Sequence, residues 1–317
     1  MKEIGGYFEL ELARKKEYHR DAIKLNSGRN AFKYILHAQN INKVYIPALI
    51  CNSVIEPLIG LEISYEFYNV DEKYEILQEI LLEENERLLY PNYYSLKSIY
   101  IQKLAKQYGE RLIIDNTQSF FEKPIECIDT IYSPRKYFGV CDGGYLYTKK
   151  YLEEDLDRDV SYNNAFHLLG RADISASDFY DKYQESEERV AEKQIRKMSK
   201  LTSKILSSID YESVKRIRER NFHYLHGELC KHNQICIDMS TNLPFMYPLM
   251  IDDGELRNKL ISNKIYVAKY WTEVLDRKQS SESERELVNK IIPLPIDQRY
   301  GLNDMKRIVE IIKDELE

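Results

Sequence analysis

A lysine that follows a short apolar run offers the clearest chemistry in this sequence. The segment contains Ser133, Arg135 and Lys136, and the triplet Asp142-Gly143-Gly144 comes soon after it. A lysine removed from water in a pocket is less favoured as an ammonium ion, so its amine can attack an aldehyde. Ser133 can bind a phosphate oxygen, and the glycine pair permits a tight turn into the next strand. The alternative is that Lys136 and Arg135 form an ordinary solvated pair.

An acid and an amide follow another apolar run. In Leu112-Ile-Ile-Asp115, three apolar residues deliver a carboxylate at the end of the predicted strand, and Gln118 lies three residues further on. An ionised Asp115 there can keep a ring nitrogen protonated, while Gln118 contacts another edge of the same ring. The alternative is that Asp115 caps the following turn.

A third candidate site precedes a predicted helix, at Ser27-Gly28-Arg29. Ser27 can cap that helix, and Gly28 lets a ligand approach the backbone closely. Free N–H groups and the dipole at a helix start bind phosphate, and Arg29 can add a charge-assisted contact. The alternative is a plain cap and turn.

These three segments need a scaffold that brings them together, and the first half of the chain provides one. Short apolar runs alternate with amphipathic stretches, which predicts a parallel sheet covered by helices on both faces. Ligands of such sheets bind outside the carboxyl ends of the strands, where Asp115 and Lys136 are expected to lie. The expected strands are Val44–Ile46, Ile63–Tyr68, Leu88–Tyr90, Leu112–Ile114, Thr130–Tyr132 and Tyr145–Tyr147, and the expected helices are Asn30–His37, Ser53–Leu58, Tyr74–Leu82 and Leu96–Tyr108.

The pattern changes after about Leu152. Apolar residues recur at roughly helical spacing over 178–207, which predicts one long charged helix with a solvated face. Ser280–Glu284 is polar and is expected to be a loop tip. The remaining expected elements are a helix at 211–232, a strand at 245–250, elements at 255–263 and 264–268, and a final helix at 303–316. We therefore expect a large α/β domain over 1–200 and a small α+β domain over 201–317.

Composition excludes several classes of function. The net charge of −6 over 317 residues argues against a nucleic-acid partner. The five cysteines show no metal-binding spacing, which is typical of reduced thiols in the cytoplasm. No apolar stretch is long enough to predict a signal peptide or a membrane span. His223 and His226 lack further ligands in the sequence, so we expect surface histidines and no metal.

Taken together and in this order, the three candidate segments resemble the DegT/DnrJ/StrS family of sugar aminotransferases that depend on pyridoxal 5'-phosphate (PLP). The family pattern has Ser-Gly-x before a helix, then Asp with Gln three residues later, then Ser…Lys…(Asp/Glu)-Gly-Gly. Ile291–Arg299 is similar to the family's late Leu-Pro strand, and 254–268 to the element before it, so the resemblance covers nearly the whole chain. It implies the three-layer fold of fold-type I PLP transferases, with a mostly parallel sheet and a smaller C-terminal α+β domain.

The resemblance also implies roles for individual residues. Lys136 is expected to hold the cofactor covalently, Asp115 to pair with the pyridinium nitrogen and Gln118 to lie near the ring hydroxyl. The residues implied to bind the phosphate are Ser27, Gly28, Arg29 and Ser133. The implied reaction moves an amino group from an amino acid, expected to be glutamate, to a keto-sugar, expected to be nucleotide-linked, in a cytoplasmic homodimer.

Other interpretations stay open. Related sugar dehydratases have His in place of the lysine, which Lys136 argues against. A non-catalytic or regulatory relative that binds a ligand without transamination is the main alternative, because the sequence lacks the family's aromatic residue on the cofactor ring and the Asn of its partner loop. Basic side chains that can meet a nucleotide phosphate are Arg171, Arg216, Arg218 and Lys269, with solvated charges as the alternative.

The departures concern the cofactor ring, the phosphate motif and the partner loop. Cys51 stands where the family has an aromatic residue on the ring, and Tyr93 or Tyr94 is a candidate substitute. Arg29 replaces the usual small hydroxyl residue. Leu169-Gly-Arg171 lacks the Asn that often precedes this Arg in a loop reaching the partner subunit. Trp271 lies where the family has a substrate-facing loop, but a core or interface position is the favoured interpretation.

Overall fold

A seven-stranded sheet forms the centre of the protein, whose computed structural model describes residues 4–191, 193–239, 243–252 and 254–316. The strand order is β1-β7-β6-β5-β4-β2-β3, with β2 to β6 parallel and β7 antiparallel to both of its neighbours. The strands are β1 (Ile23–Leu25), β2 (Lys43–Pro47), β3 (Ser64–Tyr68), β4 (Glu86–Pro91), β5 (Leu112–Asp115), β6 (Asp129–Tyr132) and β7 (Gly144–Tyr147). The expected mostly parallel sheet is confirmed, and β1 is a strand that the sequence pattern missed.

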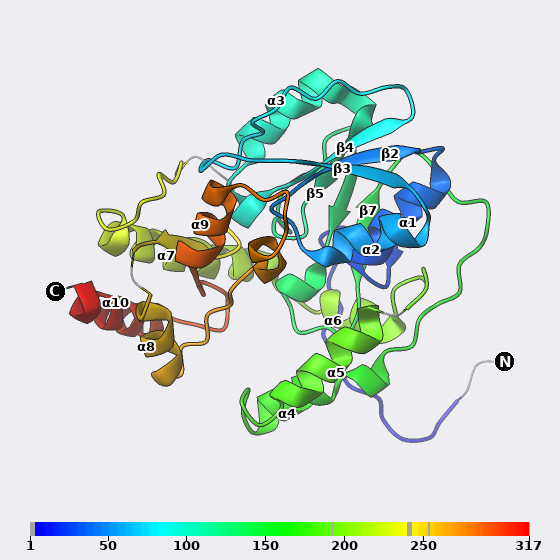
Figure 1. Cartoon of the computed structure of the whole chain (residues 1–317). Helices are drawn as coiled ribbons and strands as arrows, with labels where there is room; N and C mark the ends of the chain where they lie inside the picture. Colours follow the sequence, from blue (N-terminus) through cyan, green and yellow to red (C-terminus); the bar gives the residue numbers. More distant parts are fainter. Residues whose placement is uncertain (1–3, 192, 240–242, 253, 317) are drawn as a thin grey trace.

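Both faces of the sheet are buried, and the side chains along each strand alternate between them. In β5, for example, Leu112 and Ile114 belong to one apolar cluster and Ile113 to another. The helices on the Ile113 face are α1 (Gly28–Ala38) and α2 (Asn52–Gly60), and the Leu112 face is covered in part by α3 (Ser98–Tyr108). Figure 1 shows α1 and α2 on one side of the strands and α3 on the other. The fold therefore has three layers.

The C-terminal part builds its own small sheet. In it, β8 (Tyr247–Met250) pairs antiparallel with β9 (Ile291–Leu294), and both strands contribute to an apolar cluster with the neighbouring helices. The remaining helices are α4 (Phe166–Asp173), α5 (Tyr180–Ala191), α6 (Lys200–Leu206), α7 (Tyr211–Leu229), α8 (Leu256–Ser262), α9 (Glu282–Lys290) and α10 (Leu302–Leu316). In Figure 1, α7 to α10 gather at the left, apart from α4 to α6. Residues 264–268 are irregular.

The helix expected at Tyr74–Leu82 is wrong, because local hydrogen bonds favour a turn. The Asp71 carboxylate accepts hydrogen bonds from the backbone N–H groups of Lys73 at 2.9 Å and Glu75 at 2.8 Å. Such bonds compete with helix formation. Tyr74 is in the left-handed region at φ 61° and is buried with its ring stacked on Tyr93.

The single helix expected over 178–207 is also wrong. The chain leaves the helical conformation after α5 and runs beside β1, where Arg196 and Met198 exchange backbone hydrogen bonds with Asn26 and Lys24. These bonds satisfy the outer edge of β1, which the helix would leave open. Ser199 then caps α6.

The loop tip expected at Ser280–Glu284 is wrong as well. Ser281 and Glu284 form a capping box at the start of α9, and Glu284 is fully buried. Its carboxylate also accepts hydrogen bonds from Asn69 Nδ2 at 2.8 Å and from the Val70 N–H at 3.1 Å.

Among the described helices, none is both long enough and apolar enough to cross a membrane.

Candidate active site

A cavity of about 230 Å³ opens at the carboxyl ends of β4, β5 and β6 and at the start of α1. Segments far apart in the sequence form its wall, including α2, α5 and Trp271. All seven residues that sequence reasoning selected line it: Ser27, Gly28, Arg29, Asp115, Gln118, Ser133 and Lys136. This is the sheet edge at which ligands of open α/β folds bind.

A larger and more open hollow of about 370 Å³ lies at the opposite edge of the sheet, beside Cys127 and Lys149. None of the seven selected residues lines it. Because binding chemistry depends on convergent polar groups more than on volume, the smaller cavity is the better candidate for an active site.

The start of α1 forms one end of this cavity. Ser27 Oγ accepts a hydrogen bond from the Asn30 N–H at 3.0 Å and so caps the helix. A Cβ atom on Gly28 would lie 3.2 Å from Thr117 Cγ2 and 3.7 Å from Ser133 Cβ. The glycine therefore keeps open a small space that Ser133 and Thr117 border. With the helix dipole behind it, this end suits an anion.

The guanidinium of Arg29 points partly toward α2. It forms an ion pair with Glu56 at 3.1 Å, and its Nε is buried without a hydrogen-bond partner among the described residues. A buried donor without a partner is costly, and an anionic ligand in the cavity can satisfy it.

The segment Asp142-Gly143-Gly144 packs against the residues that begin α1 and so supports this end of the cavity. Gly143 has φ 128° and donates its N–H to Asn26 O at 2.7 Å. A Cβ on Gly144 would lie 2.3 Å from Ser27 O, so only glycine permits this approach. The buried Asp142 carboxylate accepts hydrogen bonds from the N–H and Oγ of Ser199, at 2.8 and 2.7 Å. The triplet therefore positions the start of α1 against the segment after α5.

Thr117 contacts both Lys136 and Asp115. Lys136 ends a short 3-10 helix after β6, and its Nζ lies 3.0 Å from Thr117 Oγ1. The backbone N–H of Thr117 donates to Asp115 Oδ1 at 2.8 Å. The amine and the carboxylate thus face the same cavity from the ends of neighbouring strands. Both residues lie at the sheet edge where the sequence pattern predicted them. Thr117 was not predicted, because only this geometry distinguishes it from an ordinary loop residue.

Two hydrogen bonds fix Gln118, one to its side chain and one to its backbone carbonyl. Its side-chain Oε1 accepts a hydrogen bond from the Tyr94 N–H at 2.9 Å, and its carbonyl accepts one from the Tyr137 hydroxyl at 2.7 Å. Burial raises the pKa of Tyr137, which keeps that hydroxyl protonated as a donor. The loop carrying Asp115 and the loop carrying Lys136 are therefore tied together.

Arg218 explains how the C-terminal part supports the Lys136 loop. It is 1% exposed, lies 4.4 Å from the Tyr137 ring and donates to Phe245 O at 3.0 Å. Burial lowers the pKa of its guanidinium, which the neighbouring Tyr137 and Asp297 partly offset. The interpretation of Arg218 as a nucleotide-phosphate contact is wrong, because the side chain is enclosed in the interior.

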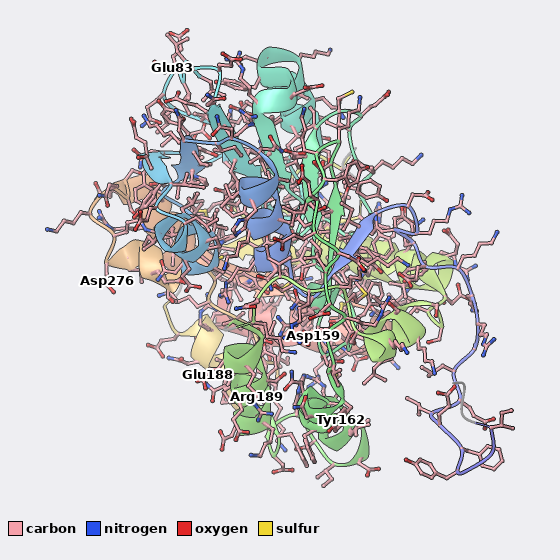
Figure 2. All side chains as sticks on the ribbon, turned by 90° about the vertical axis from the view of Figure 1, so that its right-hand side faces the viewer. Glu83, Asp159, Tyr162, Glu188, Arg189 and Asp276 are labelled. Atoms are coloured by element: carbon pink, nitrogen blue, oxygen red, sulfur yellow. The ribbon has the colours of Figure 1, made fainter. Side chains whose placement is uncertain are left out.

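The α5 helix closes another side of the cavity. Glu187 lines it and forms an ion pair with Arg135, the neighbour of Lys136. Figure 2 shows Glu188 and Arg189, which follow on α5, at the lower end of the molecule with Tyr162. A hydrogen bond of 3.3 Å from Arg189 to Asn163 O holds α5 to that region.

The aromatic wall differs from the expectation. Cys51 lines the cavity with its Sγ 2.7 Å from Ser53 Oγ. Tyr93 and Tyr94 are buried behind the wall, and the Tyr93 hydroxyl donates to Leu49 O at 2.9 Å. Trp271 lines the cavity while packing against both tyrosines, so it is more than a core residue. In the sequence, the one sign that Trp271 lines the cavity was its place where the family has a substrate-facing loop.

Comparisons with known proteins agree with this geometry at the level of the fold. No family model matches the sequence, and no curated protein matches it significantly. Solved structures match over most of the chain. A DegT/DnrJ/EryC1/StrS aminotransferase from Brucella abortus is 15% identical, with a TM-score of 0.60 over 92% of this chain and 85% of that one.

Two further solved structures carry information on the reaction of those proteins. The sugar aminotransferase CalS13 from Micromonospora echinospora is 14% identical, with a TM-score of 0.63 over 93% of this chain and 87% of that one. DesI, solved in the presence of its TDP-sugar product, is 13% identical, with a TM-score of 0.65 over 92% and 79%. The resemblance drawn from the motifs is therefore confirmed for the fold, which is that of fold-type I aminotransferases.

Proposed function

We propose that this protein is a PLP-dependent aminotransferase that moves an amino group from an amino acid to a nucleotide-linked keto-sugar. One observation carries the proposal: the Lys136 amine, the Asp115 carboxylate and the capped start of α1 at Gly28 line one cavity of about 230 Å³. An aldehyde, a ring nitrogen and a phosphate are the three groups that such a set can recognise together.

The residues present fit the cofactor. The space kept open by Gly28 and bordered by Ser133 suits a phosphate. The Nε of Arg29, which has no hydrogen-bond partner in the described part of the chain, supplies a further donor. Asp115 is the partner for the ring nitrogen, and Lys136 is the group for covalent attachment. PLP, when bound, acts as an electron sink for the negative charge that forms on the carbon bearing the amino group.

Side chains of the protein itself would then carry out the proton transfer. With PLP bound, the free Lys136 amine would act as the general base that takes the proton from the donor's α carbon. Thr117 Oγ1, 3.0 Å from Nζ, holds the amine on this side of the cavity. Asp115 keeps the ring nitrogen protonated throughout.

The substrates follow from the comparisons and the family resemblance. The TDP-sugar product of DesI supports a nucleotide-linked acceptor, and the family resemblance supports glutamate as the donor. We further propose two domains, 1–200 and 201–317, since the buried residues of one apolar cluster all lie within 222–312. The five free cysteines support a location in the cytoplasm. The family resemblance supports a homodimer.

The proposal predicts that purified protein gains the visible absorption of PLP attached to a lysine. Lys136→Ala should abolish this band, while Lys103→Ala, which removes an exposed lysine of α3, should leave it unchanged. Release of 2-oxoglutarate from glutamate with a panel of keto-sugars then measures turnover. A wild-type protein that stays colourless with added PLP would rule out the proposal.

A non-catalytic relative that binds PLP is the second candidate. It is favoured by Cys51, which gives the cavity a small thiol where the family has an aromatic ring. The absorption band without any release of 2-oxoglutarate, across amino donors and sugars, would favour this candidate.

A further inference from the structure

Trp271 gives the cavity its largest flat apolar surface. It is half-buried and lines the cavity, and it is the single tryptophan of the 317-residue chain. Tyr93 and Tyr94 hold it from behind, with ring centroids at 5.5 and 5.6 Å and interplanar angles of 75° and 81°. Edge-to-face packing of this kind fixes the plane of the indole and leaves another part of it for a ligand.

The segment that carries Trp271 is fastened to the loop after β2. Arg277 donates hydrogen bonds to Ala48 O, to Ile50 O at 2.9 Å and to Asn52 Oδ1 at 2.9 Å. Glu273 accepts one from the Asn52 N–H at 3.4 Å. From this loop Ile50 and the small Cys51 line the cavity, and neither is aromatic, so the indole completes the wall at this place.

The backbone of Trp271 is in the left-handed conformation, with φ 56° and ψ 38°. This conformation is unfavourable for a side chain of this size, and it persists only where the surroundings enforce it. The hydrogen bonds of Arg277 to the loop after β2 and the packing of the two tyrosines against the indole are such surroundings. Strain of this kind concentrates at ligand-binding positions.

We propose that Trp271 stacks on a face of the PLP ring, which deepens the proposed function and rests on it. Asp115 and Lys136 act on groups at the edge of the pyridine ring, so its faces are left to apolar side chains. The other aromatic residue of the wall, Phe32, is 2% exposed and belongs to the core. A planar heteroaromatic ring and an indole attract each other when stacked.

The fluorescence of the protein tests proximity directly, because Trp271 is its single tryptophan. PLP added to cofactor-free protein should quench the tryptophan emission, with saturation at the same PLP concentration as the lysine-bound absorption band. Lys136→Ala should lose the absorption band, and Lys103→Ala should keep both signals. An absorption band that forms while the emission stays unchanged overturns the inference and leaves the proposed function intact.

Two variants separate stacking from simple proximity. Trp271→Leu keeps an apolar side chain but no aromatic face, so PLP should bind about 2- to 12-fold more weakly. Trp271→Phe keeps a ring, and its affinity should stay within about twofold of the wild type. Unchanged binding in Trp271→Leu, or equal losses in both variants, overturns stacking.

Circular dichroism and thermal unfolding of both variants exclude a folding defect. If Trp271→Leu does not fold, the wild-type quenching and the Trp271→Phe affinity still decide the inference. If the wild type shows neither an absorption band nor quenching, the proposed function fails and this inference fails with it.

Discussion

His19 should make the stability of this fold fall between pH 6.5 and pH 4. Its ring is 2% exposed and lies among Phe120, Tyr132 and Tyr145, with centroid distances of 4.8, 4.2 and 5.1 Å. Nε2 lies 2.7 Å from Phe120 O, so it carries the proton, and Nδ1 lies 3.2 Å from the Tyr147 hydroxyl. The ring therefore fits the interior in its neutral form.

Burial lowers the pKa of His19 from 6.5 to about 4, against a smaller opposing effect of the Phe120 carbonyl. The pKa is lower in the folded state than in the unfolded chain, so protons favour unfolding and stability is lost as the pH falls through this window. From these two values the free energy of unfolding drops by about 2 kcal/mol at pH 5 and about 3 kcal/mol at pH 4.

Urea unfolding at pH 7.5, 6.5, 5.5 and 5.0 measures this loss. His19→Gln keeps a donor for the Phe120 carbonyl but does not titrate, so its curve should be flatter than that of the wild type by about 2 kcal/mol over this range. Subtracting the curve of the variant from that of the wild type isolates the contribution of His19. This is needed because burial also lowers the pKa of His167 and His226, which are present in both proteins. Parallel curves for the two proteins would refute the reasoning.

Further variants test the support of the cavity and of the C-terminal part. Gly144→Ala places a Cβ 2.3 Å from Ser27 O, so it should lower the free energy of unfolding by about 1–3 kcal/mol and weaken PLP binding. Gly227→Ala, in the last turn of α7 with nothing within 4 Å of the added Cβ, is the matched control and should raise the free energy of unfolding by up to about 1 kcal/mol in the same urea experiment. Glu284→Ala leaves the Val70 N–H without its acceptor and should cost about 1–3 kcal/mol by urea unfolding, and an unchanged midpoint would contradict this role.

The sheet and the residues at its edge could be predicted from the sequence because both depend on local patterns. Each apolar run such as 112–114 is long enough for a buried strand, and the chain must turn at its end. Asp115 therefore follows β5, and Lys136 lies shortly after β6. The parallel pairing then brings them to one edge without any further information.

The error at 74–82 follows from local hydrogen bonds of Asp71, whereas that at 178–207 arose where distant contacts decide the local conformation. Helical spacing over 178–207 is real, but residues 196–198 pair with β1 from the other end of the chain. Trp271 depends in the same way on Arg277 reaching the loop after β2. Neither contact leaves a periodic pattern. The buried Glu284 is different, because Ser281 three residues before it is a capping signal that was present in the sequence.

The pairing of β1 with β7 also determines when the cavity can exist during synthesis. The start of α1 leaves the ribosome early, but Ser27 is held by Gly143 and Gly144, and Asn26 by Arg196. A nascent chain must therefore extend past Arg196 before the end of the cavity at α1 forms, and the wall at Trp271 comes later still. A ligand of this cavity can therefore bind only after the chain has been made as far as Trp271, when segments distant in the sequence already hold one another in place.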